Sequence, residues 1–159
     1  MTGQIFTSAM TCYRIGDVNG NYPIFSHIGA TQDPGRWHTT AFPLIYTSEH
    51  YSTALLEKLI HYSGAPPPHQ HYVKITIPAG LGYEMFDTAS IPDWFKVGNT
   101  ETPVFGSEWV RQKRSPVLIV PSSAAHIERN FLINPFHPDY AKITADLHMP
   151  VHWDMRLFI

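Results

Sequence analysis

Short runs of branched and aromatic residues alternate with polar and proline-rich stretches along the chain. Such runs, bounded by turn residues, are typical of β-strands. The pattern predicts strands at about residues 11–15, 44–46, 72–77, 117–120 and 131–133. The end of the chain, 151–158, alternates with a period of two and predicts a closing strand. Its core-facing residues would be Val151, Trp153, Met155 and Leu157.

Two segments have the spacing of helices. Ser48 is expected to act as N-cap of the first, which runs to about residue 62 and ends before the prolines at 66–68. The second is expected to be capped by Thr102, to open at Pro103 and to run through Arg111. The apolar stripe of the first helix would consist of Leu55, Leu56, Leu59 and Ile60. Strands interleaved with so few helices predict an α+β fold.

Composition narrows the class of protein. A length of 159 residues suits one compact domain spanning 1–159, and 43% hydrophobic residues are enough for a folded core. A net charge of −2 without any run of Lys or Arg argues against direct contact with nucleic acid. The single Cys12 excludes an intramolecular disulfide and is expected in the core, although a nucleophilic role stays open. Without an apolar run long enough for a membrane span, or a signal-peptide pattern, we expect a cytoplasmic protein that does not contact membranes.

Three polar residues, Arg36, Tyr46 and Glu57, are spaced ten and eleven positions apart across a turn, a strand and a helix. The Pro34-Gly35 turn would present Arg36 at a loop edge. Tyr46 would lie near the end of its strand, and Glu57 would border the apolar stripe of its helix, where a carboxylate can face a cleft. The alternative is that the three are unrelated: a surface charge, a core aromatic ring and a solvated helix carboxylate.

Several segments around these residues occur in the order found in one known family. They are Tyr13-Arg14-Ile15, Gly35-Arg36-Trp37, Ile45-Tyr46-Thr47-Ser48, Ala54-Leu55-Leu56-Glu57, Gly106-Ser107-Glu108-Trp109, Val120-Pro121-Ser122-Ser123 and the stretch 130–138. Over nearly its whole length the chain resembles RES-domain proteins, the toxin half of bacterial toxin–antitoxin pairs. The resemblance implies a fold similar to that of mono-ADP-ribosyltransferases, with a dinucleotide in a cleft between small antiparallel sheets.

The resemblance also implies a site and a partner. The positions that match the family's active-site residues are Arg14, Arg36, Tyr46, Glu57 and Ser122, although the adjacent Ser123 leaves the choice of serine open. The expected substrate is NAD+, with no further cofactor, and the expected partner is a DNA-binding Xre-like antitoxin. A homodimer is compatible with the number of aromatic residues, but periodicity identifies no interface.

The chemistry of NAD+ cleavage assigns an expected role to each residue. Nicotinamide leaves as a neutral ring, so no acid has to protonate it, and a carboxylate such as Glu57 can stabilise the positive charge that develops on the ribose. Arg14 and Arg36 can hold the pyrophosphate through bidentate contacts. Tyr46 can stack on the nicotinamide ring, and Ser122 can hydrogen-bond its amide or the ribose. No Gly-x-Gly-x-x-Gly follows a strand, so a dinucleotide would not be held in the Rossmann manner.

Three functions fit these residues. The first is NAD+ glycohydrolase or phosphorylase activity, which would deplete cellular NAD+ and arrest growth. The second is transfer of ADP-ribose to a protein, which needs an acceptor surface that sequence does not reveal. The third is a binding module that has lost activity. The presence of Arg36, Tyr46 and Glu57 argues against this third function.

Ten histidines raise the alternative of a metal site. His69 and His71 follow three prolines in what we expect to be a surface loop. Pro150 interrupts the helical turn that would align His148 with His152. We therefore expect no structural or catalytic metal.

Overall fold

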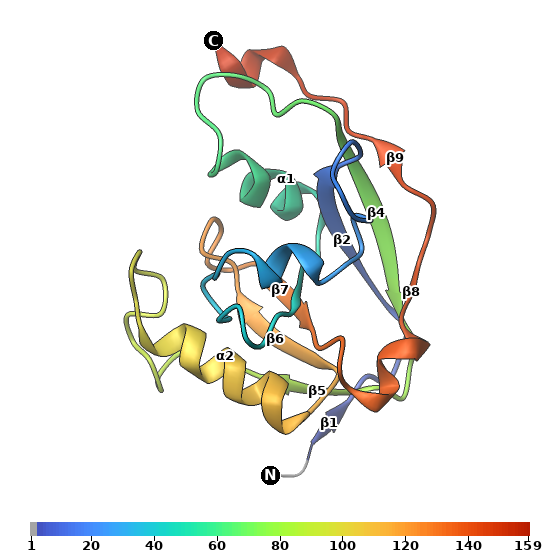
Figure 1. Ribbon diagram of the computed structural model, residues 1–159, viewed down its shortest axis with the longest axis vertical. Helices are drawn as coiled ribbons and strands as arrows, with labels where there is room; N and C mark the ends of the chain where they lie inside the picture. Colours follow the sequence, from blue (N-terminus) through green and yellow to red (C-terminus); the bar gives the residue numbers. More distant parts are fainter. Residues whose placement is uncertain (1–2) are drawn as a thin grey trace.

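The computed structural model describes residues 3–159, in which nine strands form one mixed sheet flanked by two α-helices (Figure 1). The strands are β1 (Gln4–Ile5), β2 (Met10–Asp17), β3 (Ile45–Ser48), β4 (Gln70–Ile77), β5 (Gly82–Met85), β6 (Val117–Pro121), β7 (Arg129–Ile133), β8 (Thr144–Ala145) and β9 (Met149–Pro150). The helices are α1 (Tyr51–Leu59) and α2 (Glu101–Gln112), with 3-10 helices η1 (Ile28–Thr31), η2 (Pro138–Lys142) and η3 (Met155–Phe158). None of the helices in this part of the chain is long and apolar enough to cross a membrane.

The sheet consists of two halves that meet along a short seam. Its order is β1-β5-β6-β7-β3-β2-β4-β8, with β9 also paired to β4. All neighbours are antiparallel except β5 and β6. Between β3 and β2 only Tyr13 and Ser48 are in register, whereas β2 and β4 are paired along all of β2. The α+β prediction is confirmed, and the expected small antiparallel sheets correspond to two halves of one continuous sheet.

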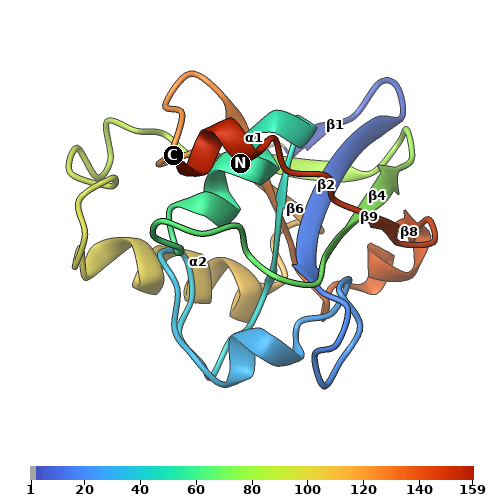
Figure 2. The ribbon, with the colours of Figure 1, turned by 90° about the horizontal axis from the view of Figure 1, so that it is seen from above.

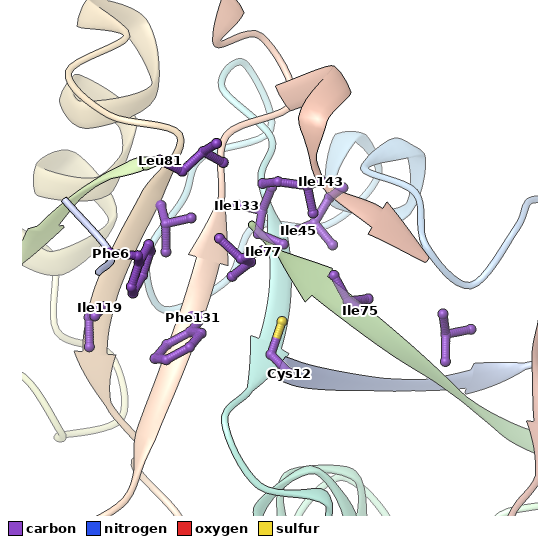
Figure 3. Packing of buried hydrophobic residues seen from close by; sticks show 12 residues of the cluster. Phe6, Cys12, Ile45, Ile75, Ile77, Leu81, Ile119, Phe131, Ile133 and Ile143 are labelled. Carbon is purple, nitrogen blue, oxygen red and sulfur yellow. The ribbon is translucent and has the colours of Figure 1, made fainter. Parts of the chain in front are cut away.

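Period-two alternation places the two hydrophobic cores on opposite faces of the sheet. In β6, Val117 and Ile119 belong to the first core, whereas Leu118 and Val120 belong to the second. The first core also takes side chains from β2, β3, β4 and β7, and Figure 3 shows Cys12 among them. Burial raises the pKa of the Cys12 thiol to about 12, so the thiol is protonated at neutral pH. Cys12 is therefore a core residue, not a nucleophile.

The second core is covered by α2, which packs very closely against the loop that follows η1. Trp109 and Val110 of α2 are buried there beside Trp37. Gly106 allows the approach, because a Cβ at this position would lie 1.7 Å from the carbonyl oxygen of Trp37. The absence of a side chain at Gly106 thus permits the loop that carries Arg36 to pack directly against α2.

The predicted C-terminal strand is wrong. Residues 151–154 are irregular, and Met155–Phe158 form η3, in which Met155 and Leu157 are exposed. The segment lies at the outside of the molecule, at the end opposite the N-terminus in Figure 1, and Figure 2 shows this end from above. The preceding strand β9 pairs with β4 over only two positions, so residues 151–158 have no partner strand with which to extend the sheet.

Both predicted helices exist, but their capping residues and the apolar stripe of the first were misassigned. Ser48 is the last residue of β3, and His50 is the N-cap of α1. Thr102 is buried inside α2, where the side chain of Asn99 accepts hydrogen bonds from the first backbone amides. The buried residues of α1 are Thr53 and Ala54, whereas Leu56 and Ile60 of the predicted stripe are exposed.

Candidate functional site

A cleft of about 710 Å³ opens at the seam where β2 and β3 diverge. This volume is within the usual range for small-molecule sites. Its walls come from β2, the 29–38 loop, β3, α1 and the 96–103 segment before and within α2. Four of the five residues expected in the site line it, namely Arg14, Arg36, Tyr46 and Glu57. Segments distant in sequence therefore converge on one concave site.

Glu57 is held by two neutral donors, one directly after β6 and the other on β7. The hydroxyl of Ser122 donates to its Oε1 at 2.6 Å, and Nδ2 of Asn130 donates to the same oxygen at 2.9 Å. Asn130 is oriented in turn by Ser48, whose hydroxyl donates to Oδ1 at 2.8 Å. Among residues 3–159 no hydrogen bond occupies Oε2 of Glu57. One carboxylate oxygen is thus fixed, and the other is available to a ligand.

The two adjacent serines have different environments in the structure. Ser122 is fully buried, and its Oγ also accepts hydrogen bonds from the backbone amides of Ala124 and Ala125. Its hydroxyl proton is directed at Glu57. Ser123, in contrast, lines the cleft. Ser122 therefore contacts the carboxylate, and Ser123 is the serine that faces the open space.

The hydroxyl of Tyr46 is fixed by His38, which is 3% exposed. Nε2 of His38 lies 3.0 and 2.9 Å from the carbonyl oxygens of Ala30 and Asp33, which can only accept, so Nε2 carries the proton. Burial lowers the pKa of His38, which leaves the ring neutral with Nδ1 as acceptor. Tyr46 therefore donates to Nδ1 at 2.7 Å and accepts from the amide of Trp37 at 3.1 Å.

Gly35 is required for this arrangement, because a Cβ there would lie 2.5 Å from the Tyr46 hydroxyl oxygen and 2.8 Å from the His38 ring. Its amide donates to the carbonyl of His38, which closes the turn expected from Pro34-Gly35. Burial also raises the pKa of the Tyr46 phenol well above its usual value. Tyr46 is thus a neutral, rigid ring at neutral pH.

The two arginines are oriented by backbone carbonyls. Nη1 of Arg36 donates to the carbonyls of Trp94 and Lys96 at 2.8 and 3.2 Å. Arg14 spans the seam, since Nε donates to Ile24 at 2.6 Å and Nη1 donates to the Tyr46 carbonyl at 2.9 Å. No carboxylate of the described residues lies within ion-pair distance of either guanidinium. Each keeps donors that can bind an anion.

The cleft is positive although the whole chain carries −2. Its walls include four cationic side chains, Arg14, Arg36, Lys58 and Lys96, against two carboxylates, Asp33 and Glu57. Glu57 is held by Ser122 and Asn130 and by neither guanidinium. An anionic ligand is therefore favoured near the arginines, and positive charge is favoured near Glu57.

Two of the histidines considered as metal ligands meet in the structure, and His71 lies in β4, not in the expected surface loop. Nδ1 of His71 and Nδ1 of His148 lie 2.8 Å apart on an exposed surface, outside the cleft. Two nitrogens are too few for a closed metal site. Between residues 3 and 159 no group of three or more His, Cys, Asp or Glu side chains is arranged to hold a metal ion.

Sequence reasoning missed three residues that orient the site: His38, Ser48 and Asn130. His38 immediately follows the Gly35-Arg36-Trp37 segment, and Asn130 begins the 130–138 stretch, so both lie next to segments that attracted attention. Nothing in the spacing indicates that His38 meets Tyr46. Ser48 and Asn130 are register partners on β3 and β7, a pairing that the sequence did not indicate.

Comparison with known proteins agrees with this architecture. A protein named "Prs ADP-ribosylating toxin" from Sphingobium sp. (strain YBL2) is 32% identical over 151 residues, which cover 89% of this chain and 86% of that protein. A protein named "Toxin Res" from Photorhabdus laumondii is 32% identical over 136 residues, with 84% and 86% covered. A chain of the crystal structure of the M. tuberculosis MbcT-MbcA toxin-antitoxin complex has the same fold, with a TM-score of 0.70 at 14% identity over 94% of this chain and 87% of that one. The model of the RES domain matches residues 11–154, and the chain belongs to the RES-domain family.

Proposed function

We propose that the protein is a toxin that cleaves NAD+ at the bond between nicotinamide and ribose. The observation that carries the proposal is the position of Glu57, which lines a positive cleft with one oxygen fixed by Ser122 and Asn130 and the other unoccupied. A carboxylate held by neutral donors keeps its charge available for a cation that forms nearby. The positive charge that develops on the ribose during cleavage is such a cation.

The remaining residues of the cleft fit the other parts of NAD+. Arg14 and Arg36 carry donors without carboxylate partners and suit the pyrophosphate. Tyr46, held rigid by His38, suits stacking on the nicotinamide ring. Ser122 donates its only proton to Glu57, so we assign it to positioning that carboxylate in place of a direct contact with the nicotinamide amide or the ribose. The direct contact falls to Ser123, which lines the cleft.

Transfer of ADP-ribose to a protein is a second candidate. It is favoured by the name of the Sphingobium relative, "Prs ADP-ribosylating toxin", at 32% identity. Cleavage of the same bond is common to both candidates, and they differ only in the group that attacks the ribose. Attack by water would give free ADP-ribose, and attack by inorganic phosphate would give ADP-ribose phosphate. Attack by a protein side chain would leave the ADP-ribose covalently attached to that protein.

Purified protein incubated with NAD+ labelled in the adenylate part tests these candidates. We expect release of nicotinamide together with labelled ADP-ribose, or ADP-ribose phosphate when phosphate is present. Label that follows protein in a denaturing gel, after addition of a cell lysate, would assign the transfer reaction. NAD+ that binds the protein and is recovered intact under every condition would favour the inactive binding module and contradict the proposal.

A partner that controls the activity is expected if the protein is a toxin. The structural neighbour comes from a toxin-antitoxin complex, and relatives at 32% identity are named toxins. We propose that an Xre-like antitoxin binds this chain and supplies the contact with DNA, since the net charge of −2 does not favour nucleic acid here. Affinity purification from cells that also contain the adjacent gene should recover its product in a stoichiometric complex. Recovery of the chain alone would contradict this partner.

A further inference from the structure

Lys58 follows Glu57 on α1 and lines the same cleft, yet the roles proposed above leave it unused. Its side chain is half-buried, and no carboxylate of the described residues lies within ion-pair distance of Nζ. Burial, and then the neighbouring Arg14 guanidinium, lower the pKa of Lys58, whereas Asp17 raises it. Lys58 is thus a cation that lies near the Arg14 guanidinium and has no carboxylate within ion-pair distance.

Arg14, on the neighbouring strand β2, is in the same situation. Its Nε and Nη1 donate to the carbonyls of Ile24 and Tyr46, which leaves Nη2 without a described acceptor. Burial is costly for a guanidinium, and neutral carbonyls compensate only part of that cost. Two like charges that line one cavity, neither of them in a described ion pair, destabilise the empty site and are favourable once an anion lies between them.

The other lysine of the cleft is different. Nζ of Lys96 lies 3.2 Å from the carboxylate of Asp93, and both side chains are more than half exposed. Its charge is therefore balanced and screened by water. Lys58, in contrast, combines partial burial, a neighbouring guanidinium and the absence of a described carboxylate partner.

We propose that Lys58 and Arg14 together form a phosphate-binding subsite on the wall made by α1 and β2. An ammonium group acts as a compact charge, whereas the guanidinium offers directed donors, and the two are complementary on a tetrahedral oxyanion. The occupant is a phosphate group, either of the dinucleotide pyrophosphate or of free inorganic phosphate. The assignment rests on the proposed NAD+ cleavage for its biological meaning, but the binding can be measured without any reaction.

The test is calorimetric titration of wild type, Lys58→Met and Lys58→Arg with ADP-ribose and, separately, with inorganic phosphate. Lys58→Met removes the charge and keeps a chain of similar length, and Lys58→Arg keeps the charge. Lys74→Met is the matched control, because Lys74 is exposed on β4 and does not line the cleft. Loss of one charge-assisted contact should weaken binding by about tenfold or more.

The two sources of phosphate give different results. Weaker ADP-ribose binding by Lys58→Met, restored in Lys58→Arg, would place the dinucleotide pyrophosphate in the subsite. Weaker binding of inorganic phosphate with unchanged ADP-ribose affinity would assign free phosphate. Affinities for both ligands that equal those of Lys74→Met would overturn the subsite.

A second measurement does not depend on a variant. In wild-type protein with reductively methylated lysines, the NMR signal of Lys58 should shift when phosphate or ADP-ribose is added, and the signal of Lys74 should stay in place. An unchanged Lys58 signal at saturating ligand would also overturn the subsite. If NAD+ is never cleaved but ADP-ribose affinity still depends on Lys58, then the proposed function fails and the phosphate subsite stands.

Discussion

Replacing Glu57 with glutamine should lower the rate of nicotinamide release from NAD+ by about 10²-fold to 10³-fold, the effect of removing one electrostatic stabiliser of a transition state. The amide oxygen of glutamine can still accept the hydrogen bonds of Ser122 and Asn130 that Oε1 accepts now. The variant therefore keeps the local geometry and removes only the charge. Nicotinamide release at saturating NAD+ measures the effect, and a thermal melt shows whether the fold is retained.

Ser122→Ala provides a graded comparison for this experiment. It leaves the carboxylate charged but removes one of the two donors to Oε1, so it should reduce kcat less than Glu57→Gln does. Asn130 would continue to hold the same oxygen. Full activity of Glu57→Gln would remove the carboxylate from the mechanism. A loss in Ser122→Ala as large as that in Glu57→Gln would mean that the hydroxyl itself touches the substrate.

Gly106→Ala should destabilise the protein by about 3 kcal/mol or more, at the upper end of the cost of overpacking. In an exposed helix the same substitution would stabilise by up to about 1 kcal/mol, because alanine is the better helix former. Here the added methyl would lie 1.7 Å from the carbonyl oxygen of Trp37, a contact that forces either α2 or the loop to move. Urea unfolding followed by tryptophan fluorescence measures the loss of free energy of unfolding.

Val104→Ala is the control for Gly106→Ala, since Val104 is exposed on the same helix and should change stability by well under 1 kcal/mol. Gly106→Ala should also reduce NAD+ cleavage under conditions in which it is still folded, because Trp37 is adjacent to Arg36. Wild-type stability in Gly106→Ala would show that α2 does not approach the loop as closely as described.

Elements with a strong local pattern were predictable from sequence. The continuous apolar runs at 117–120 and 131–133 identify two central strands, because each face of those strands is buried against a different core. The helix that carries Glu57 was placed to within a few residues. The period-two alternation at 151–158 led to the wrong prediction of a strand. Such a period describes which side chains would share a face, and it does not guarantee that a partner strand is present. The parallel strand β5, Gly-Tyr-Glu-Met, contains no run of branched residues and was not recognised.

The residues of the candidate site were predictable from sequence, whereas the hydrogen bonds that orient them were not. Arg36, Tyr46 and Glu57 lie close together in sequence, and the turn, strand and helix that present them were recognised. The hydrogen bonds that orient them join residues separated by up to 73 positions, as between Glu57 and Asn130. Such pairs depend on strand register, which no local preference determines. The contact between His38 and Tyr46 depends on how a loop packs against a strand, which the sequence pattern does not indicate either.

The two halves of the sheet, which meet at the cleft, are joined there by few contacts. Most strands here are joined by ladders of several residues, whereas β2 and β3 share one register pair, helped by the Arg14 guanidinium and by the packing of α1 against both strands. The cleft opens at this joint, and Arg14 of β2 and Glu57 of α1 both line it. Arg14 therefore has two structural roles: it lines the cleft, and it ties β2 to β3 through its hydrogen bond to the Tyr46 carbonyl.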